Sequence, residues 1–285
     1  MITVKLKNKH EIPSRWSDFT PQMKDQFVAL ACAMDDFERG IFTFEQFKLC
    51  IVVSLLGIQL HKLKMSGDTF YENAFRISEL VTFPYTLTDQ EDGSKVVNVN
   101  VSLCRNILPE LGGHKGYTLD VTSAGVVDCS LTAEQYVDAL TLTDLYTKTR
   151  STETLDQLVT VLYGSTRDIS ILERTAVYYN FRGFLDWLQS LPPYAIIFQH
   201  TGRKKGGESP LGLASSIFTV SKQGYGTLKE IKELDLFSYL GVLVQMSIDS
   251  IHQLASAGLK AGEISEKTRI PIDLVLLHLN DDIES

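Results

Sequence analysis

Residues 131–164 read LTAEQYVDALTLTDLYTKTRSTETLDQLVTVLYG, and this stretch decides the fold that we expect for the chain. Thr132 is followed three positions later by Gln135, which is the pattern of a capping box at the start of a helix. Apolar side chains recur at helical spacing on both sides of a polar break at 147–152. Gly164 suits the left-handed residue that follows a helix. The stretch therefore predicts two helices joined by a turn, with one apolar face.

A second stretch, residues 26–57, repeats this pattern earlier in the chain. It opens with Gln-Phe-Val and closes with Leu-Leu-Gly, where the later stretch has Gln-Tyr-Val at 135–137 and Leu-Tyr-Gly at 162–164. Two interpretations are open. Either the stretches are an internal repeat whose apolar hairpins stack on each other, or they are two amphipathic hairpins that are alike by composition alone.

Between the hairpins the residue types change from helix formers to strand formers. Residues 81–87 and 96–103 are rich in β-branched and aromatic residues, and Asp92-Gly93 between them suits the turn of a β-hairpin. Residues 117–121 form a candidate third strand, and 2–7 a short strand near the N-terminus. Periodicity and caps also predict helices at 66–80, 172–188, 211–220, 235–258, 263–268 and 272–279.

These elements predict a mainly α-helical α+β protein, with helical hairpins around one core and a small antiparallel β insert. We expect an N-terminal arm and the first hairpin in 1–80, and the β insert in 81–130. Residues 131–285 are expected to form a helical domain that shares one core with 1–80.

The composition is that of a folded protein without a membrane span. The 285 residues are 44% hydrophobic and 22% charged, which permits a sizeable core. The formal net charge of −8 argues against nucleic acid as a partner, because phosphates attract basic surfaces. The N-terminus lacks the apolar region of a signal peptide, and the longest apolar run, 49–60, is too short to span a bilayer. We therefore expect a cytoplasmic protein with no membrane partner.

The best phosphate-binding candidate is the loop 202–209, GRKKGGES. A phosphate-binding loop of the form G-x-x-x-x-G-K-S/T uses its lysine to reach the phosphates. Here both glycines and the serine fit, but Glu208 replaces the lysine and places negative charge beside the phosphate. A solvated basic loop is the favoured interpretation, and nucleotide binding is the less favoured alternative. The basic residues that we assign to docking an acidic partner are Arg203, Lys204 and Lys205.

No other stretch has the spacing of a catalytic or metal site. The six histidines form no H-x-x-x-H pair, and there is no G-x-S-x-G elbow. Cys129 and His114 lie near each other in sequence but have no third partner for nucleophilic catalysis. Residues 263–279 have the rhythm of a DNA-reading helix-turn-helix but lack the polar side chains that read bases. We therefore expect no catalytic residue, no metal and no cofactor.

Residues 178–187, YYNFRGFLDW, carry more aromatic side chains than one helix face needs. One interpretation is a buried core. The other is a partly exposed aromatic groove that takes an amphipathic helix from another protein. The residues assigned to partner binding on the second interpretation are Tyr178, Phe181, Phe184 and Trp187.

Motifs built from helix caps and core positions frame the two hairpins. The first is Ile12-Pro13-x-x-Trp16-x-x-Phe19-Thr20-Pro21, with Leu55-Leu56-Gly57-Ile58 at the end of its hairpin. The second is Leu131-Thr132-x-x-Gln135-Tyr136-x-Asp138-Ala139, with Leu158-x-x-x-Leu162-Tyr163 at its end. With these motifs the chain, outside the β insert, resembles proteins of Bacteroidetes phages and prophages whose genes lie among tail-morphogenesis genes. Related proteins often continue after Leu-Tyr with Arg-Pro, where this chain has Gly164-Ser165.

This resemblance implies a non-enzymatic protein that is similar to tail assembly chaperones. Such a protein would shield apolar helices of a tail component, in our expectation the tape measure, in the host cytoplasm until assembly. The alternative is a structural subunit of the virion, such as a tail-completion or baseplate component. The residues leave the oligomeric state open.

Overall fold

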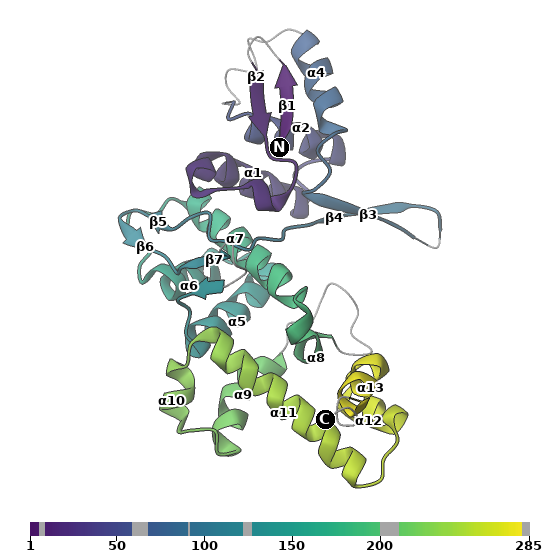
Figure 1. Cartoon of the computed structure of the whole chain (residues 1–285). Coiled ribbons are helices and arrows are strands. Elements are labelled where there is room, and N and C mark those ends of the chain that lie inside the picture. Colours follow the sequence, from purple (N-terminus) through teal and green to yellow (C-terminus); the bar gives the residue numbers. More distant parts are fainter. Residues whose placement is uncertain (6–8, 59–67, 91, 122–126, 200–210, 281–285) are drawn as a thin grey trace. The chain divides into compact units, whose positions relative to one another are not determined.

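The computed structural model describes residues 1–5, 9–58, 68–90, 92–121, 127–199 and 211–280 (Figure 1). Its fold is α+β and mainly helical, with small antiparallel two-stranded sheets, which confirms the predicted fold class. The basic loop 202–209, with Arg203, Lys204 and Lys205, lies outside the described residues. Its nucleotide and docking interpretations therefore stay predictions. Of the described helices, none is both long and apolar enough to cross a membrane.

The chain divides into two compact units. Unit 1 comprises 1–125 and 163–186, and unit 2 comprises 126–162 and 187–285. The boundaries of these units differ from those of the expected segments 1–80, 81–130 and 131–285. Most of the predicted β insert belongs to the same unit as the N-terminal residues. Residues 163–186 from the later half of the chain also belong to unit 1 and bond directly to the insert. There the N–H of Leu103 donates to the carbonyl of Gly183 at 2.9 Å.

Unit 1 combines a helical hairpin, three β-hairpins and one long helix. Its main elements are β1 (Ile2–Lys5), β2 (Lys9–Ile12), α1 (Lys24–Glu38), α2 (Phe44–Leu55), α4 (Asp68–Ser78), β3 (Tyr85–Asp89), β4 (Lys95–Val99), β5 (Glu110–Leu111), β6 (His114–Lys115), β7 (Leu119–Val121) and most of α7 (Ile171–Gln189). The pairs β1–β2, β3–β4 and β5–β6 are antiparallel. The sequence predicted the first strand of β1–β2 but missed the second.

The predicted first helical hairpin is formed by α1 and α2. A capping box between Thr43 and Gln46 starts α2, and Gly40 takes the positive φ of +71° that the turn requires. The Thr20-Pro21 pair of the first motif opens a tighter turn before α1. Pro21–Met23 forms a 3₁₀ turn, in which the N–H of Met23 donates to the carbonyl of Thr20, and α1 begins only afterwards.

Aromatic rings fill the part of unit 1 between this hairpin and β3. Phe37 of α1 stacks on Phe47 of α2 with ring centroids 4.5 Å apart, and Tyr85 meets Phe44 edge-on at 5.0 Å. Trp16 packs edge-on against Phe83 at 4.9 Å. Such ring pairs stabilise a core beyond the area that they bury.

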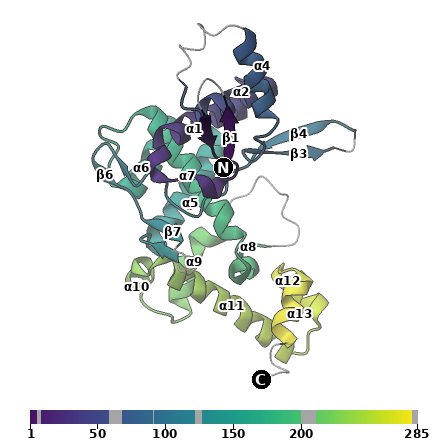
Figure 2. The ribbon, with the colours of Figure 1, turned by 45° about the horizontal axis from the view of Figure 1, so that its top comes forward.

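The β3–β4 hairpin is anchored at its base and exposed at its tip. Its register pairs Tyr85 with Val99 and Leu87 with Val97, so these four side chains share one face. Tyr85 and Val99 are each 8% exposed, whereas Leu87 is 50% exposed. In both ribbon views the hairpin extends away from the helices of unit 1 (Figures 1 and 2).

A buried polar network joins α7 to the chain that follows β4. The amide of Asn180 accepts the N–H of Ile107 at 2.9 Å and donates to the side-chain oxygen of Asn106 at 3.0 Å and to the hydroxyl of Tyr117 at 2.9 Å. The hydroxyl of Tyr163 donates to the carbonyl of Leu108 at 2.6 Å. Because these groups are buried and need hydrogen-bond partners, the network determines where the chain that follows β4 lies on α7.

Unit 2 is helical apart from one short strand. Its elements are β8 (Val127–Cys129), α5 (Ala133–Thr149), nearly all of α6 (Thr152–Tyr163), the 3₁₀ turn Pro192–Tyr194, α8 (Ala195–Phe198), α9 (Leu211–Lys222), α10 (Leu228–Glu233), α11 (Leu236–Ser256), α12 (Ala261–Thr268) and α13 (Ile272–Asn280). Both ribbon views show α12 and α13 at the C-terminal end of α11 (Figures 1 and 2).

The caps predicted for α5, α6 and α11 are present. Thr132 and Gln135 form the expected capping box of α5, and Gly164 has a φ of +77°. Asp235 caps α11 by accepting the N–H of Ser238 at 3.0 Å. The two helix starts are also joined, because Thr132 and Asp235 form an antiparallel bridge. Helix α10 was missed in the sequence, although Thr227 opens a capping box there.

Candidate functional site

The aromatic rings assigned to partner binding lie inside the protein. Tyr178, Phe181 and Phe184 are each 0% exposed, and only Trp187 is half-buried. The β insert packs against two of them: Tyr117 lies edge-on to Phe181 with centroids 6.2 Å apart, and its ring is 6.3 Å from that of Phe184. A ring without exposed surface cannot contact a partner, so for these three residues the exposed-groove interpretation is wrong and the core interpretation is confirmed.

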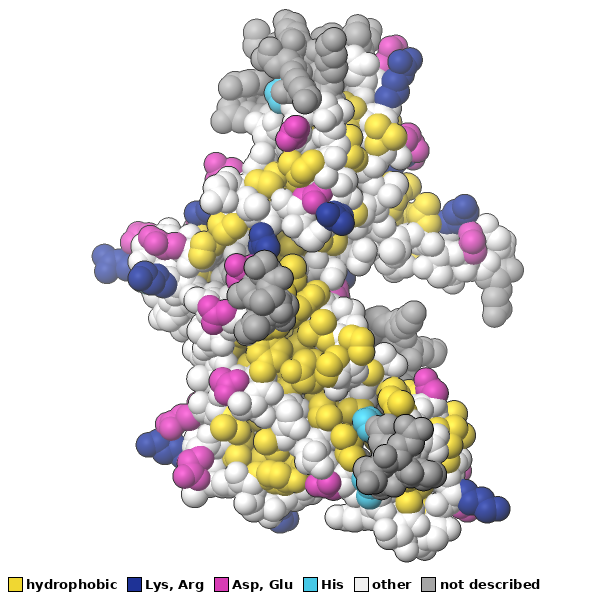
Figure 3. Space-filling view, in the orientation of Figure 1, with side chains coloured by type: hydrophobic (Ala, Val, Ile, Leu, Met, Phe, Trp, Pro, Cys, Tyr) yellow, Lys and Arg dark blue, Asp and Glu magenta, His cyan; other side chains and the backbone are white. Residues whose placement is uncertain are grey.

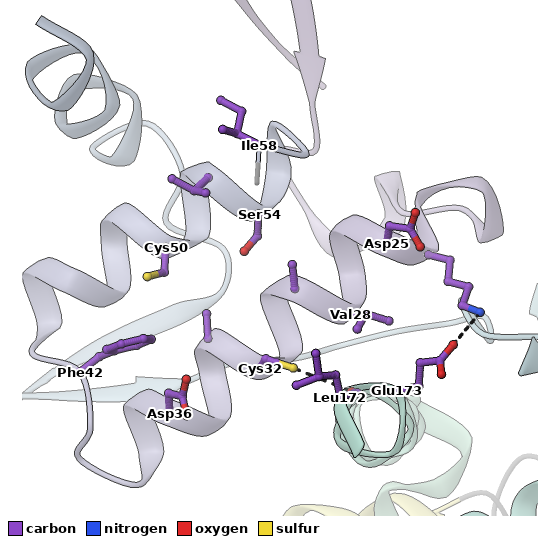
Figure 4. Close-up of a pocket in the computed structure, with 14 residues that line it drawn as sticks. Asp25, Val28, Cys32, Asp36, Phe42, Cys50, Ser54, Ile58, Leu172 and Glu173 are labelled. Atoms are coloured by element: carbon purple, nitrogen blue, oxygen red, sulfur yellow. Dashed lines mark hydrogen bonds and ion pairs between the residues drawn. The ribbon is translucent and has the colours of Figure 1, made fainter. Parts of the chain in front are cut away.

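An open apolar pocket lies elsewhere in unit 1, between α1, α2 and the first turn of α7 (Figure 4). Its volume is about 500 Å³, within the range of small-molecule and side-chain binding pockets. Helix α1 contributes Val28, Ala29 and Cys32 to the wall, and α2 contributes Cys50, Val53 and Ser54. Leu172 at the start of α7 closes one side and is 55% exposed.

The pocket exists because the outward strip of α1 is made of small side chains. Ala29, Cys32 and Ala33 recur at helical spacing, whereas the bulky Phe27 and Leu30 turn into the core and are fully buried. Across the pocket α2 presents two further small residues, Cys50 and Ser54, whose side chains point toward the space between the helices in Figure 4. Small residues that face each other leave a hollow that a larger group from outside can fill.

Ion pairs hold the walls of the pocket together at both ends of α1. At its start the ammonium of Lys24 lies 2.9 Å from the carboxylate of Glu173. At its end Glu38 accepts hydrogen bonds from Arg182 at 2.6 Å and from the hydroxyl of Tyr179 at 2.8 Å. Partial burial raises the pKa of Glu173, but hydrogen bonds from Lys24 and Ser170 outweigh this and lower it below the usual value. Helix α1 is thereby fixed along α7, and the pocket is preformed.

The two thiols in the pocket are not nucleophiles at neutral pH. Burial, and then the nearby carboxylates of Asp36 and Asp35, raise the pKa of Cys32 to about 12. Burial and Asp36 also raise the pKa of Cys50. Because the thiolate is the reactive form, both residues act here as small apolar groups. The part of the chain that the structure describes contains no cluster of three His, Cys, Asp or Glu residues suited to a metal ion.

Stability above pH 9 is expected to depend on Cys32. The unfolded thiol loses its proton near its ordinary pKa of 9, whereas the folded thiol keeps it up to about 12. Its stabilising contribution is therefore complete below pH 9 and is lost as the pH rises toward 12. Between pH 8 and 10.5 the free energy of unfolding should fall by about 2 kcal/mol more in the wild type than in Cys32→Ala.

Urea unfolding at the two pH values measures this difference. The control is Val28→Ala, which shortens a side chain of the same wall without removing a titratable group. It should keep the pH dependence of the wild type. Equal losses of stability in the wild type and in Cys32→Ala would contradict the assignment.

A second pocket, of about 470 Å³, lies in unit 2 beside α11 and has mainly polar walls. Its carboxylate, Asp249, accepts a hydrogen bond from the hydroxyl of Tyr225 at 3.3 Å and from the amide of Gln245 at 2.8 Å. Both oxygens of this carboxylate are thus engaged by neighbours. The described residues around this pocket include no second carboxylate and no histidine. This arrangement is not that of a general acid–base pair.

A signal for the apolar pocket is present in the sequence, and the predictions above missed it. Cys32 and Cys50 are both half-buried and border the hollow. The small residues Ala29, Cys32 and Ala33, which lie opposite the bulky residues of the same helix, mark a second and less filled face.

Neither the surface charge nor any known protein points to another kind of site. On the face drawn in Figure 3, basic and acidic side chains lie interspersed rather than in one basic field. No family model, curated protein or solved structure matches the chain. The chemistry of the apolar pocket is therefore the main guide to function: a preformed, uncharged floor with charged groups at its rim.

Proposed function

We propose that this protein binds an apolar helix of another protein in the pocket between α1, α2 and α7, as a non-enzymatic factor in phage tail assembly. The observation that carries the proposal is the open pocket of about 500 Å³ with apolar walls. The assignment to tail assembly rests on the resemblance of the hairpin motifs to phage tail-morphogenesis proteins. The expected partner is a tail component such as the tape measure.

Binding would follow the helix-in-groove mode, in which side chains of one helix enter a groove between others. Because α1 and α2 face the pocket mainly with small residues, the large anchoring side chains that fill it would come from the partner. Apolar area removed from water contributes about 25 cal/mol per Å². Leu172, which is 55% exposed beside the pocket, gains most from being covered.

An assembly chaperone would hold this helix in the host cytoplasm and release it during assembly. A structural virion subunit would keep the same contact permanently. Mass spectrometry of purified particles distinguishes the two, because a chaperone is absent from the finished particle and a tail-completion or baseplate subunit is present.

We expect a tail protein to co-purify with the tagged chain from cells that produce phage particles. The variant Ala29→Gln/Leu172→Gln places two polar side chains at exposed positions in the pocket wall. It should lower recovery of the partner by about tenfold or more, because covering a leucine is worth about 1.5–3 kcal/mol. Quantitative mass spectrometry of the captured proteins measures this loss.

The matched control is Leu80→Gln/Ala257→Gln, which makes the same changes at exposed positions that do not line the pocket. It should recover the partner as well as the wild type does. The proposal fails if no tail protein is recovered, or if the pocket variant recovers it undiminished.

A further inference from the structure

The outward strip of α1 carries a carboxylate at each end of the pocket. Asp25 lies at one end and Asp36 at the other, with Val28, Ala29 and Cys32 between them (Figure 4). On an α-helix this spacing corresponds to about three turns, or about 16 Å, so both carboxylates lie on the same face. The strip is therefore apolar in the middle and acidic at both ends.

The charges at the pocket do not cancel. Among the described residues that line the pocket, Lys24 is the basic one, and it is paired with Glu173 at 2.9 Å. Asp25 and Asp36 thus give these described lining residues an excess of two negative charges. Among the residues that the structure describes, neither carboxylate takes part in an ion pair, and Asp25 is exposed.

We propose that the pocket selects a partner helix whose apolar strip is flanked at both ends by lysine or arginine. This inference rests on the proposed function and adds the chemistry of the partner. Two basic residues about three turns apart would reach Asp25 and Asp36 while the apolar side chains between them enter the pocket. Charges arranged in this way increase the association rate and reject helices with acidic ends, which would meet like charges.

Three synthetic helical peptides test the inference against the full-length protein. They share one apolar strip and differ only at two end positions, which carry lysine, glutamine or glutamate at the spacing of Asp25 and Asp36. Fluorescence anisotropy of labelled peptides gives the dissociation constants. At low salt the lysine peptide should bind about tenfold more tightly than the glutamate peptide, with the glutamine peptide between them. At 1 M salt, where the Debye length is about 3 Å, this difference should nearly vanish.

The same peptides are then measured against variants of the protein in which the two carboxylates are replaced. Asp25→Lys/Asp36→Lys should invert the order of the three peptide affinities. Asp25→Asn/Asp36→Asn should make the three affinities nearly equal. The control Asp89→Lys/Glu110→Lys makes the same change in net charge at exposed positions outside the pocket and should keep the wild-type order. The salt dependence of the wild type needs no variant, so the test holds even if a variant folds poorly.

The outcomes separate this inference from the proposed function. Equal binding of the lysine and glutamate peptides at low salt overturns the charge selection but leaves an apolar binding pocket. If none of the three peptides binds, the helix-binding pocket fails, and the charge selection fails with it. A dimer of the chain that the lysine peptide cannot dissociate would assign the pocket to a second copy and overturn the inference.

Discussion

Replacing Asn180 with leucine is expected to lower the free energy of unfolding of unit 1 by about 3–5 kcal/mol. The Asn180 side chain is 1% exposed and makes three hydrogen bonds, to the N–H of Ile107, the amide of Asn106 and the hydroxyl of Tyr117. Leucine has nearly the same size but makes none of them. The N–H of Ile107 would then be buried without a partner, which costs more than the lost bond itself is worth.

Urea unfolding followed by the fluorescence of Trp16 measures this loss. Trp16 lies in the core of unit 1, and a Trp187→Phe background removes the other tryptophan. The control is Asn98→Leu on the exposed part of β4, which should change the free energy of unfolding by less than about 0.5 kcal/mol. A loss below about 1 kcal/mol for Asn180→Leu would show that the network contributes little to stability.

Gly183→Val is expected to destabilise unit 1 by about 3 kcal/mol, although valine has the better helix propensity. A Cβ atom built on Gly183 would lie 2.6 Å from a methyl carbon of Val101 and 3.0 Å from Leu103. Both neighbours are fully buried and cannot move aside. The glycine allows the chain to approach α7 so closely that Leu103 donates its N–H to the carbonyl of Gly183.

The matched control is Gly241→Val in the middle of α11. A Cβ atom there would meet nothing within 4 Å, and the position is exposed. The same substitution should change the free energy of unfolding by less than about 0.5 kcal/mol, since only helix propensity is at issue. Thermal and urea unfolding of both variants provide the comparison. Similar effects at the two glycines would mean that the close approach at Gly183 is not a constraint.

Most helix boundaries could be predicted because their signals are local. The capping box of Thr132 and Gln135, the cap Asp235 and the positive φ of Gly164 all depend on residues within a few positions of each other. The same kind of signal was present but unused at Thr227, where α10 begins. Local hydrogen bonds therefore account for where helices start and stop.

Which face of a helix is buried was harder to predict. Phe237 and Val244 share a helical face of α11 with the fully buried Leu240, but both are half-buried. The other buried residues in the first half of α11 are Leu236, Tyr239 and Leu243. An apolar helix offers more than one face to a core, and contacts with elements distant in sequence select among them.

The sequence by itself therefore determined the helical class, the two hairpins, the β insert and most caps, because hydrogen bonding and periodicity act over a few residues. Only the tertiary structure decided which apolar surface stays open. It buried Phe181 and Phe184 against the insert, because Asn180 and Gly183 hold that segment on α7, and it left Tyr178 without exposed surface as well. It left the outward strip of α1 beside an open pocket, because the side chains that line the pocket from the other segments leave about 500 Å³ unfilled. A local pattern such as the small residues of α1 can indicate a less filled face, but contacts between distant segments decide whether that face stays exposed.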